Sequence, residues 1–349
     1  MIKTITWEDI ESLLFGAAFY GCGGGGDLDA ALRMLRARGV SEAQLTSLGA
    51  SSSTVATVYE VGSVGSKPRG DPVTAIDVCL ERLEALSSKR VSVLIPVELG
   101  ATAIALTLVT ASRRGLYVAD CDRVGRAAPE IHQDLFAVNG IDPLPACVAS
   151  TDLSMVALLL RGGVDEYEWL ARGIASRFGS AIAVDGFKDS SSVVDSVAHY
   201  TLSKCIEVGH ALRTGAGIDT VCQVSGALGA LKARVVDVSL RDVGGFLEGH
   251  IVVDAEGDTY RLYVKNEVIA MLRERDGAPR ALPPDLVTLL DESMKPVHTH
   301  SITAGQRLYI LAIPCHRLWR TPRGLELFGP KRFGLDYEYV PIEELWEGV

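Results

Sequence analysis

Long apolar runs are missing from this chain of 349 residues, and basic charge is scarce. The longest apolar stretches, such as residues 154–160, fall well short of the ~20 residues that a membrane-spanning helix needs. Acidic residues outnumber basic ones by 44 to 34, and Lys and Arg occur together only in pairs such as Arg113 and Arg114. Without a basic patch, the chain has no means of attracting a phosphate backbone. We therefore expect neither a membrane nor a nucleic acid as a partner.

Cysteine pairs with a recognisable spacing are also absent. The seven cysteines are scattered and none forms a C-x-x-C motif, a pattern that is typical of reduced thiols. The N-terminal segment, MIKTITWEDIESLL, has neither a basic start nor an uninterrupted apolar stretch with a cleavage site, so it does not resemble a signal peptide. Both observations predict a cytoplasmic protein.

The chain is long enough to bury one large core or two, with 48% hydrophobic and 22% charged residues. From residue 54 to residue 149, apolar runs of strand type alternate with runs of helical spacing, which is typical of a parallel sheet. Strands are predicted at 54–60, 91–97, 116–119 and 146–149, and helices at 72–87, 101–112 and 129–139.

The second half of the chain has a different pattern. A helix at 165–178 and a long helical region at 193–231 precede short β-type runs separated by turn residues. The sequence therefore predicts an α/β protein with two domains. The N-terminal domain, residues 1–165, has a mainly parallel sheet flanked by helices. The C-terminal domain, residues 166–349, is helical at first and β-rich after about residue 232.

Charged residues gather where the predicted strand at 116–119 ends. Asp120 and Asp122 follow it directly, and open α/β sheets bind their ligands at this edge. The two carboxylates could chelate a hard cation, or one could act as a general base whose pKa its neighbour raises. Arg126 would neutralise the pair or hold a substrate carboxylate or carbonyl. The alternative is a surface loop in which Asp122 caps a turn and Arg126 forms an exposed ion pair.

A glycine run, Gly21–Gly26 with Cys22 inside it, precedes Asp27, a good N-cap for a helix beginning at Leu28. Its backbone N–H groups could bind a phosphate, a carboxylate or a developing oxyanion. The run satisfies G-x-G-x-x-G, but it follows a helix rather than a strand, so we expect no nucleotide cofactor. The alternative is a flexible helix–helix turn.

Glu98 ends the strand before Asp120, and the two carboxylates would share one rim if these strands are neighbours.

The β-rich part contributes further polar residues. Asn266 and Glu267 close one predicted strand and are either a polar strand end or part of the site. His298 and His300 would share one face of a strand and offer a metal two imidazoles, without an evident third ligand. Cys315 and His316 are adjacent, and adjacent strand residues point to opposite faces, so we expect no nucleophile pair there.

Five segments resemble the S-methyl thiohydantoin desulfurase domain family, whose members are also called hydantoinase-like. They occur in the expected order and span nearly the whole chain. These segments are GCGGGGD, DCDRVGRAAPE, KNEVIA, PPDLVTLLD and GLELFGPKRFGLDYEYVP. The resemblance implies an N-terminal α/β domain, a β-rich C-terminal domain and hydrolysis of S-methyl thiohydantoins, which are five-membered cyclic ureide-like rings. It also implies association with a hydantoinase or oxoprolinase-type subunit. The chain departs from the family's usual motifs at Cys22, Ala103 and Ala128.

These observations predict a hydrolase for a small cyclic-amide ligand, and we also expect a homo-oligomer. Asp120, Asp122 or Glu98 would activate a water, directly or through a divalent metal, to attack the ring carbon that bears sulfur. The glycine-loop amides or Arg126 would stabilise the developing negative charge. The alternative is a non-catalytic ligand-binding or accessory subunit of a hydantoinase-type complex. The expected substrate-binding residues are Gly23, Gly24, Gly25, Gly26, Asp27, Glu130, Asn266, Glu267 and Arg332.

Overall fold

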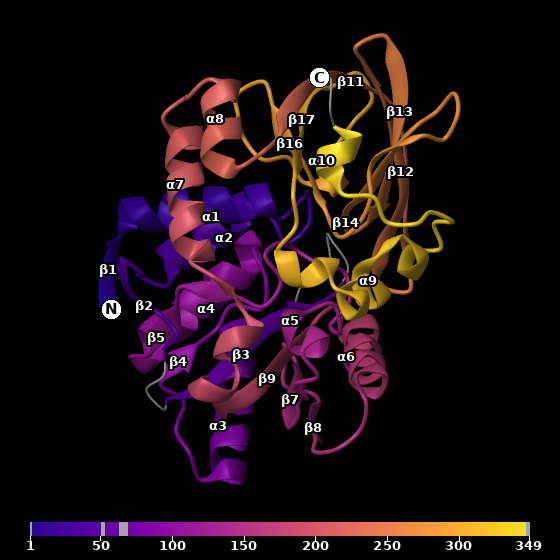
Figure 1. Cartoon of the computed structure of the whole chain (residues 1–349). Coiled ribbons are helices and arrows are strands. Elements are labelled where there is room, and N and C mark those ends of the chain that lie inside the picture. The colour runs from indigo at the N-terminus through magenta and orange to yellow at the C-terminus, as the bar shows by residue number, and fades with distance from the viewer. Residues whose placement is uncertain (1, 50–52, 63–68, 347–349) are drawn as a thin grey trace.

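The computed structural model describes residues 2–49, 53–62 and 69–346. Within them the chain forms an eight-stranded sheet, a seven-stranded sheet and a two-stranded ladder, with helices around the first sheet (Figure 1). The protein is thus a mixed α/β protein with a β-rich C-terminal part. Within the described part of the chain, no helix combines the length and the apolar character that crossing a membrane requires.

The eight-stranded sheet has the order β1-β2-β5-β4-β3-β9-β7-β8. Only β2, β5, β4 and β3 run parallel, and the remaining neighbours are antiparallel, so the expected mainly parallel sheet is corrected to a mixed one. A connection as short as that between β7 and β8 permits only antiparallel pairing. The strands are β1 (Ile2–Thr6), β2 (Glu42–Thr46), β3 (Thr54–Val61), β4 (Val93–Leu94), β5 (Tyr117–Ala119), β7 (Ala146–Ser150), β8 (Val156–Leu159) and β9 (Ala181–Asp189).

Helices cover both faces of this sheet. In β9, Ile182 and Val184 pack with α3 (Pro72–Ser87) and α4 (Ala101–Arg114), while Ala181 and Ala183 pack with α6 (Val164–Phe178) on the other face. This alternation follows from the period of two in a strand. The predicted helices at 72–87 and 101–112 are confirmed within two residues.

A further helical group places the glycine run. α1 (Trp7–Tyr20) ends just before it and α2 (Leu28–Ala37) begins just after it, capped by Asp27, which accepts a hydrogen bond from Ala30 N at 2.7 Å. α1 lies directly against α7 (Thr201–Arg213), and α8 (Ile218–Ser225) follows. A Cβ on Gly16 would lie 2.0 Å from the carbonyl oxygen of Cys205, so this packing needs glycine.

The seven-stranded sheet is antiparallel, with the order β15-β14-β13-β12-β11-β17-β16. The strand of this sheet that comes first in the sequence, β11, begins at Gly229, close to the predicted start of the β-rich part. Its strands are β11 (Gly229–Val243), β12 (Phe246–Ala255), β13 (Asp258–Lys265), β14 (Glu267–Arg273), β15 (Pro279–Ala281), β16 (Leu286–Asp291) and β17 (Arg307–Ile313). The chain ends with α9 (Pro322–Phe328), a 3-10 helix (Pro330–Phe333) and α10 (Ile342–Leu345).

Three local predictions are wrong. The helix expected at 129–139 shrinks to α5 (Leu135–Val138), because α6 side chains bind the preceding backbone, with Glu168 accepting a hydrogen bond from Ile131 N at 2.6 Å. The helical region at 193–231 is interrupted, since Gly226, at φ +79°, ends α8 and β11 begins soon after. The strand at 91–97 shortens to β4. The sequence also predicts a glycine-rich loop at residues 62–71, and residues 63–68 of it lie outside the described residues.

Candidate functional site

A cleft of about 690 Å³ lies between the part of the chain that carries the eight-stranded sheet and the part that carries the seven-stranded sheet. Its walls come from the glycine run and α2, the carboxyl end of β3, the start of α4, the loop before α5, and the turn between β13 and β14. Open α/β sheets place their ligands at such strand ends. The lining includes Gly25, Gly26, Asp27, Tyr59, Glu60, Glu98, Thr102, Ala128, Glu130, Arg172, Asn266, Glu267, His298 and His300.

The glycine loop is held on both sides. Thr102 N donates to the carbonyl oxygen of Gly25 at 2.9 Å, and Val268 N donates to that of Cys22 at 2.9 Å, so backbone from α4 and from β14 holds the loop. A Cβ on Gly25 would lie 2.4 Å from the Cα of Gly100. The loop thus uses its glycines for close approach of backbone to backbone and is held in place as part of the cleft wall.

Two glutamates enter the cleft from different parts of the chain. Glu98 precedes α4 and accepts a hydrogen bond from Ala128 N at 2.9 Å. Glu267 is the first residue of β14, is 3% exposed, and its Oε2 has no hydrogen-bond partner among the described residues. Its Oε1 lies 1.9 Å from where a Cβ on Gly24 would stand, so Gly24 makes room for this carboxyl group.

Burial changes the protonation of both glutamates. It raises the pKa of Glu98 to about 7, with a smaller contribution from the charge of Asp122, against the opposing effects of Ala128 N–H and Arg126. It raises the pKa of Glu267 to about 8, and the charge of Glu98 adds to this effect. Both carboxyl groups therefore keep their protons to a higher pH than an exposed glutamate does.

The two aspartates predicted beside Glu98 do not line the cleft, although the charge of Asp122 reaches Glu98. The carboxylate of Asp120 accepts hydrogen bonds from Ser203 N at 2.9 Å and Ser203 Oγ at 2.6 Å, in the first turn of α7. Asp122 is fully buried and accepts hydrogen bonds from the backbone N–H groups of Val124 and Gly125 at 2.8 and 2.6 Å. β4 and β5 are parallel neighbours, as that prediction required, but Glu98 lines the cleft and the two aspartates do not.

Arg126 is fully buried and also does not line the cleft. Its guanidinium donates to the carbonyl oxygens of Ala127, Pro284, Asp285 and Val268 at 2.8 to 3.2 Å. These bonds tie the loop before α5 to the seven-stranded sheet. The charge of Arg126 opposes the rise in the pKa of Glu98 and of Glu267.

Glu130 and Arg332 do meet. Glu130 lines the cleft and pairs with Arg332 Nη2 at 2.6 Å, with His132 Nε2 at 3.0 Å, and with Lys265, which the sequence analysis did not single out. Burial favours the protonated form, but hydrogen bonds from these three side chains hold the pKa of Glu130 well below its usual range. Its carboxylate is therefore a fixed negative charge.

The remaining predicted binding residues divide between two cavities. Gly25, Gly26, Asp27 and Asn266 line the cleft, and Asn266, at φ +60°, accepts a hydrogen bond from Leu247 N through Oδ1 at 2.9 Å. Gly23 and Gly24 line a smaller cavity of about 260 Å³ beside it.

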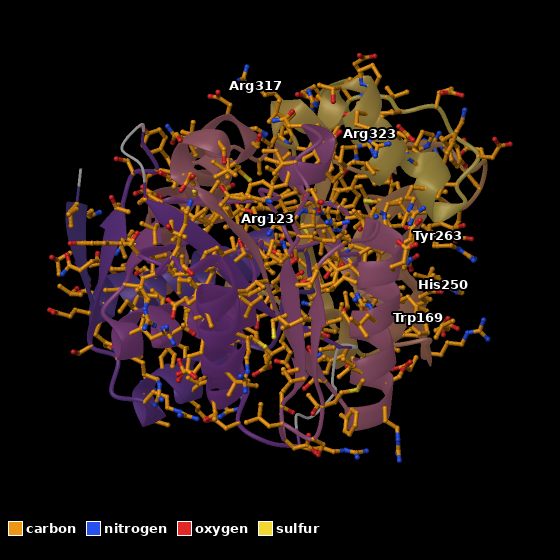
Figure 2. The ribbon with its side chains drawn as sticks, turned by 90° about the horizontal axis from the view of Figure 1, so that it is seen from below. Arg123, Trp169, His250, Tyr263, Arg317 and Arg323 are labelled. Carbon is orange, nitrogen blue, oxygen red and sulfur yellow. The ribbon has the colours of Figure 1, made fainter. Side chains whose placement is uncertain are left out.

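Sequence reasoning missed several residues of the cleft wall. Arg172 of α6 donates to Gly62 O at 3.1 Å and to Pro129 O at 2.6 Å, and so braces two cleft segments. Tyr59 donates to Asp185 Oδ2 at 2.7 Å, and Asp185 also pairs with Arg123, which lies in the interior of the molecule (Figure 2). Tyr59 and Asp185 had one available signal, a polar residue inside an otherwise apolar run, whereas Arg172 lies among other charged residues of α6 and had none.

Metal ligands do not cluster in residues 2–49, 53–62 and 69–346, where no group of three or more His, Cys, Asp or Glu side chains is arranged to hold an ion. His298 and His300 both line the cleft, with their Nδ1 atoms 2.8 Å apart. Burial, followed by the charge of His300, lowers the pKa of His298 to about 4, so its ring is neutral at physiological pH. The cleft thus combines two buried carboxyl groups of raised pKa with a neutral imidazole and the backbone of the glycine loop.

Family models match most of the chain, and a solved structure has a similar fold. Residues 8–158 match the family model "S-Me-THD-like, N-terminal domain", and residues 163–342 match "S-Me-THD-like, C-terminal domain". The search of curated proteins found no match. The crystal structure of a protein from Chromobacterium violaceum is similar, with a TM-score of 0.81 and 20% sequence identity, over 97% of this chain and 100% of that one. At that identity the likeness shows the fold alone.

Proposed function

Because this chain belongs to the S-Me-THD-like family, we propose that it hydrolyses an S-methyl thiohydantoin or a related cyclic amide. One observation supports this proposal above the others: Glu98 and Glu267, each with a raised pKa, line one cleft from separate parts of the chain. Enzymes that need an acid and a base at neutral pH use carboxyls tuned in this way. Glu98 accepts the Ala128 N–H, which favours its ionised form, so we assign it as the base. Glu267 has an oxygen, Oε2, without a hydrogen-bond partner among the described residues, so we assign it as the acid.

The reaction begins with water. Glu98 takes one proton as the water oxygen bonds to the ring carbon that bears sulfur, and the electron pair of the C=N bond moves to the ring nitrogen, which takes the proton of Glu267. The C–S bond then breaks, and the sulfur leaves as methanethiol with the proton that Glu98 held. Glu267 recovers a proton from the new hydroxyl group as it becomes a carbonyl. One substrate and one water thus give one hydantoin and one methanethiol.

The glycine loop completes this proposal. Gly25 and Gly26 line the cleft, and Gly24 abuts the carboxyl group of Glu267. We assign the backbone N–H groups of Gly25 and Gly26 to the negative charge that develops on the ring when water adds. A hydantoin product is a substrate for ring-opening hydrolases, so a subunit of hydantoinase or oxoprolinase type is the partner that this chemistry favours.

The test measures thiol release from an S-methyl thiohydantoin by the purified protein, with and without added divalent metal. Glu98→Gln and Glu267→Gln are each expected to lower turnover by about 100-fold or more, because each removes a proton-transfer group. Asp120→Asn is the matched control. Its carboxylate binds the first turn of α7 and lies outside the cleft, so turnover per folded molecule should stay within about twofold of wild type.

Two results would count against the proposal. If Asp120→Asn abolished turnover while Glu98→Gln did not, the acid and base would be wrongly assigned. If the wild-type protein bound the ring tightly by calorimetry but released no thiol under any condition, the protein would be a ligand-binding subunit rather than a hydrolase.

A further inference from the structure

Among the described residues, β8 (Val156–Leu159) forms a free edge of the eight-stranded sheet. β8 is the last strand of the eight-stranded sheet, at its lower margin in Figure 1, where it pairs with β7 and has no described strand on its other side. Ser150 N of β7 donates to the carbonyl oxygen of Met155 at 2.9 Å, so the backbone groups of Met155 point toward β7. Because these directions alternate along a strand, Val156 and Leu158 point their N–H and C=O groups to the open edge.

The side chains of this edge are apolar and exposed. The exposed fractions are 42% for Met155, 41% for Val156, 44% for Leu158 and 54% for Leu160. Open edges in natural proteins are usually protected by a lysine, a proline, a bulge or a covering segment. Residues 153–160, LSMVALLL, contain no charged residue and no proline, and β8 pairs with β7 in an unbroken register. The chain thus leaves a strand that is suited to pairing with another strand.

We propose that the edge of β8 pairs with the same edge of a second copy of this chain. Antiparallel pairing about a two-fold axis at Ala157 places Val156 of one copy opposite Leu158 of the other, and joins outward-pointing backbone groups of both copies. The apolar side chains of both strands then cover each other. The two eight-stranded sheets become continuous, and the cleft stays open because no residue of β8 lines it.

The charged residues at the two ends of β8 favour a second copy of this chain as the partner and antiparallel pairing of the two strands. Asp152 precedes the exposed strand and Arg161 follows it, and both are exposed. Antiparallel pairing brings Asp152 of each copy beside Arg161 of the other, whereas parallel pairing would place like charges together. Asp152 accepts hydrogen bonds from Ser150 Oγ and Ser154 N through Oδ1, which hold its carboxylate at the start of the exposed segment.

The test is the oligomeric state of the full chain, measured by sedimentation over a range of concentrations. We expect a dimer. Leu158→Lys should weaken it by at least about tenfold in the dissociation constant, because each copy then carries an uncompensated charge in the apolar ladder. Leu228→Lys is the matched control, since Leu228 is exposed to a similar degree, 43%, but lies outside β8, and it should leave the dimer unchanged.

A second pair of variants separates pairing from misfolding. Arg161→Glu should weaken the dimer more than Arg161→Gln does, and circular dichroism should show both folded. A wild-type protein that stays monomeric at every concentration would overturn the proposal, and so would a Leu158→Lys dimer as tight as wild type. A monomer that captures another protein through this edge would also overturn it, because the occupant would then not be a second copy.

Discussion

At the scale of single residues, Glu267 links the site to the stability of the fold. Burial places its folded-state pKa at about 8, above the value of an unfolded chain. Between these two values the folded protein binds more protons than the unfolded protein does. The contribution of Glu267 to the free energy of unfolding is therefore fully present at low pH and is lost as the pH rises through about 8.

Glu267→Gln should remove this dependence. At about pH 9 the variant should melt several degrees above wild type, because it has no charge to bury, and at about pH 4 the two should melt together. Thermal unfolding followed by circular dichroism across this range measures the difference. Glu207→Gln, an exposed glutamate of α7, serves as control and should follow wild type. If the melting temperatures of Glu267→Gln and wild type fell equally with rising pH, Glu267 would not be the source of the pH dependence.

The sequence indicated both Glu98 and Glu267 as site residues but did not indicate that they lie in the same cleft. Glu98 was predicted from its place at a strand end and Glu267 from its place beside Asn266, and only folding brings them to one cleft. Asp120 looked equivalent to Glu98 because both follow apolar runs. The difference arises from α7, whose first turn supplies Ser203 to the carboxylate of Asp120. No local pattern encodes a contact between residues so far apart in the chain.

At the scale of elements, helices with clear end signals were predicted well and strand direction was not. Asp71 with Pro72 starts α3 and Gly115 ends α4, and these signals lie within the sequence itself. Buried strands such as β9 are apolar on both faces, and such a run carries no information on whether its neighbour is parallel or antiparallel. The position of the glycine run likewise depends on α1 and α7, which are distant in sequence.

Gly209→Ala tests how far the structure depends on the close packing of α1 against α7. A Cβ at Gly209 would lie 1.7 Å from the carbonyl oxygen of Ser12, so α7 would have to move away from α1. Overpacking of this kind costs about 1–3 kcal/mol, which denaturant unfolding should detect as a lower midpoint. Gly173→Ala in α6 is the control, because nothing lies within 4 Å of its Cβ and alanine favours the helix. An unchanged midpoint for Gly209→Ala would mean that the two helices separate without cost.

At the scale of the whole molecule, ion pairs join the two sheets around the cleft. Glu130, from the loop before α5, binds Lys265 of β13 and Arg332 of the 3-10 helix at 330–333. On the other side of the glycine run, Asp29 of α2 binds Lys295 at 2.8 Å. Exposed pairs of this last kind contribute little. Glu130 differs because it is 9% exposed and faces two cations and a histidine, so together with Arg126 it links the loop before α5 to the C-terminal part of the chain.

Glu130→Gln should therefore loosen the cleft. The variant leaves Lys265 and Arg332 without their shared counter-charge, which we expect to destabilise the protein by about 1–3 kcal/mol. Turnover of the S-methyl thiohydantoin should show a KM raised by roughly tenfold with a smaller change in kcat, because Glu130 shapes the cleft but transfers no proton. Lys331→Gln is the control, since its pair with Glu338 is exposed and lies outside the cleft. A fall in kcat without a change in KM would instead place Glu130 among the groups that act on the reacting atoms.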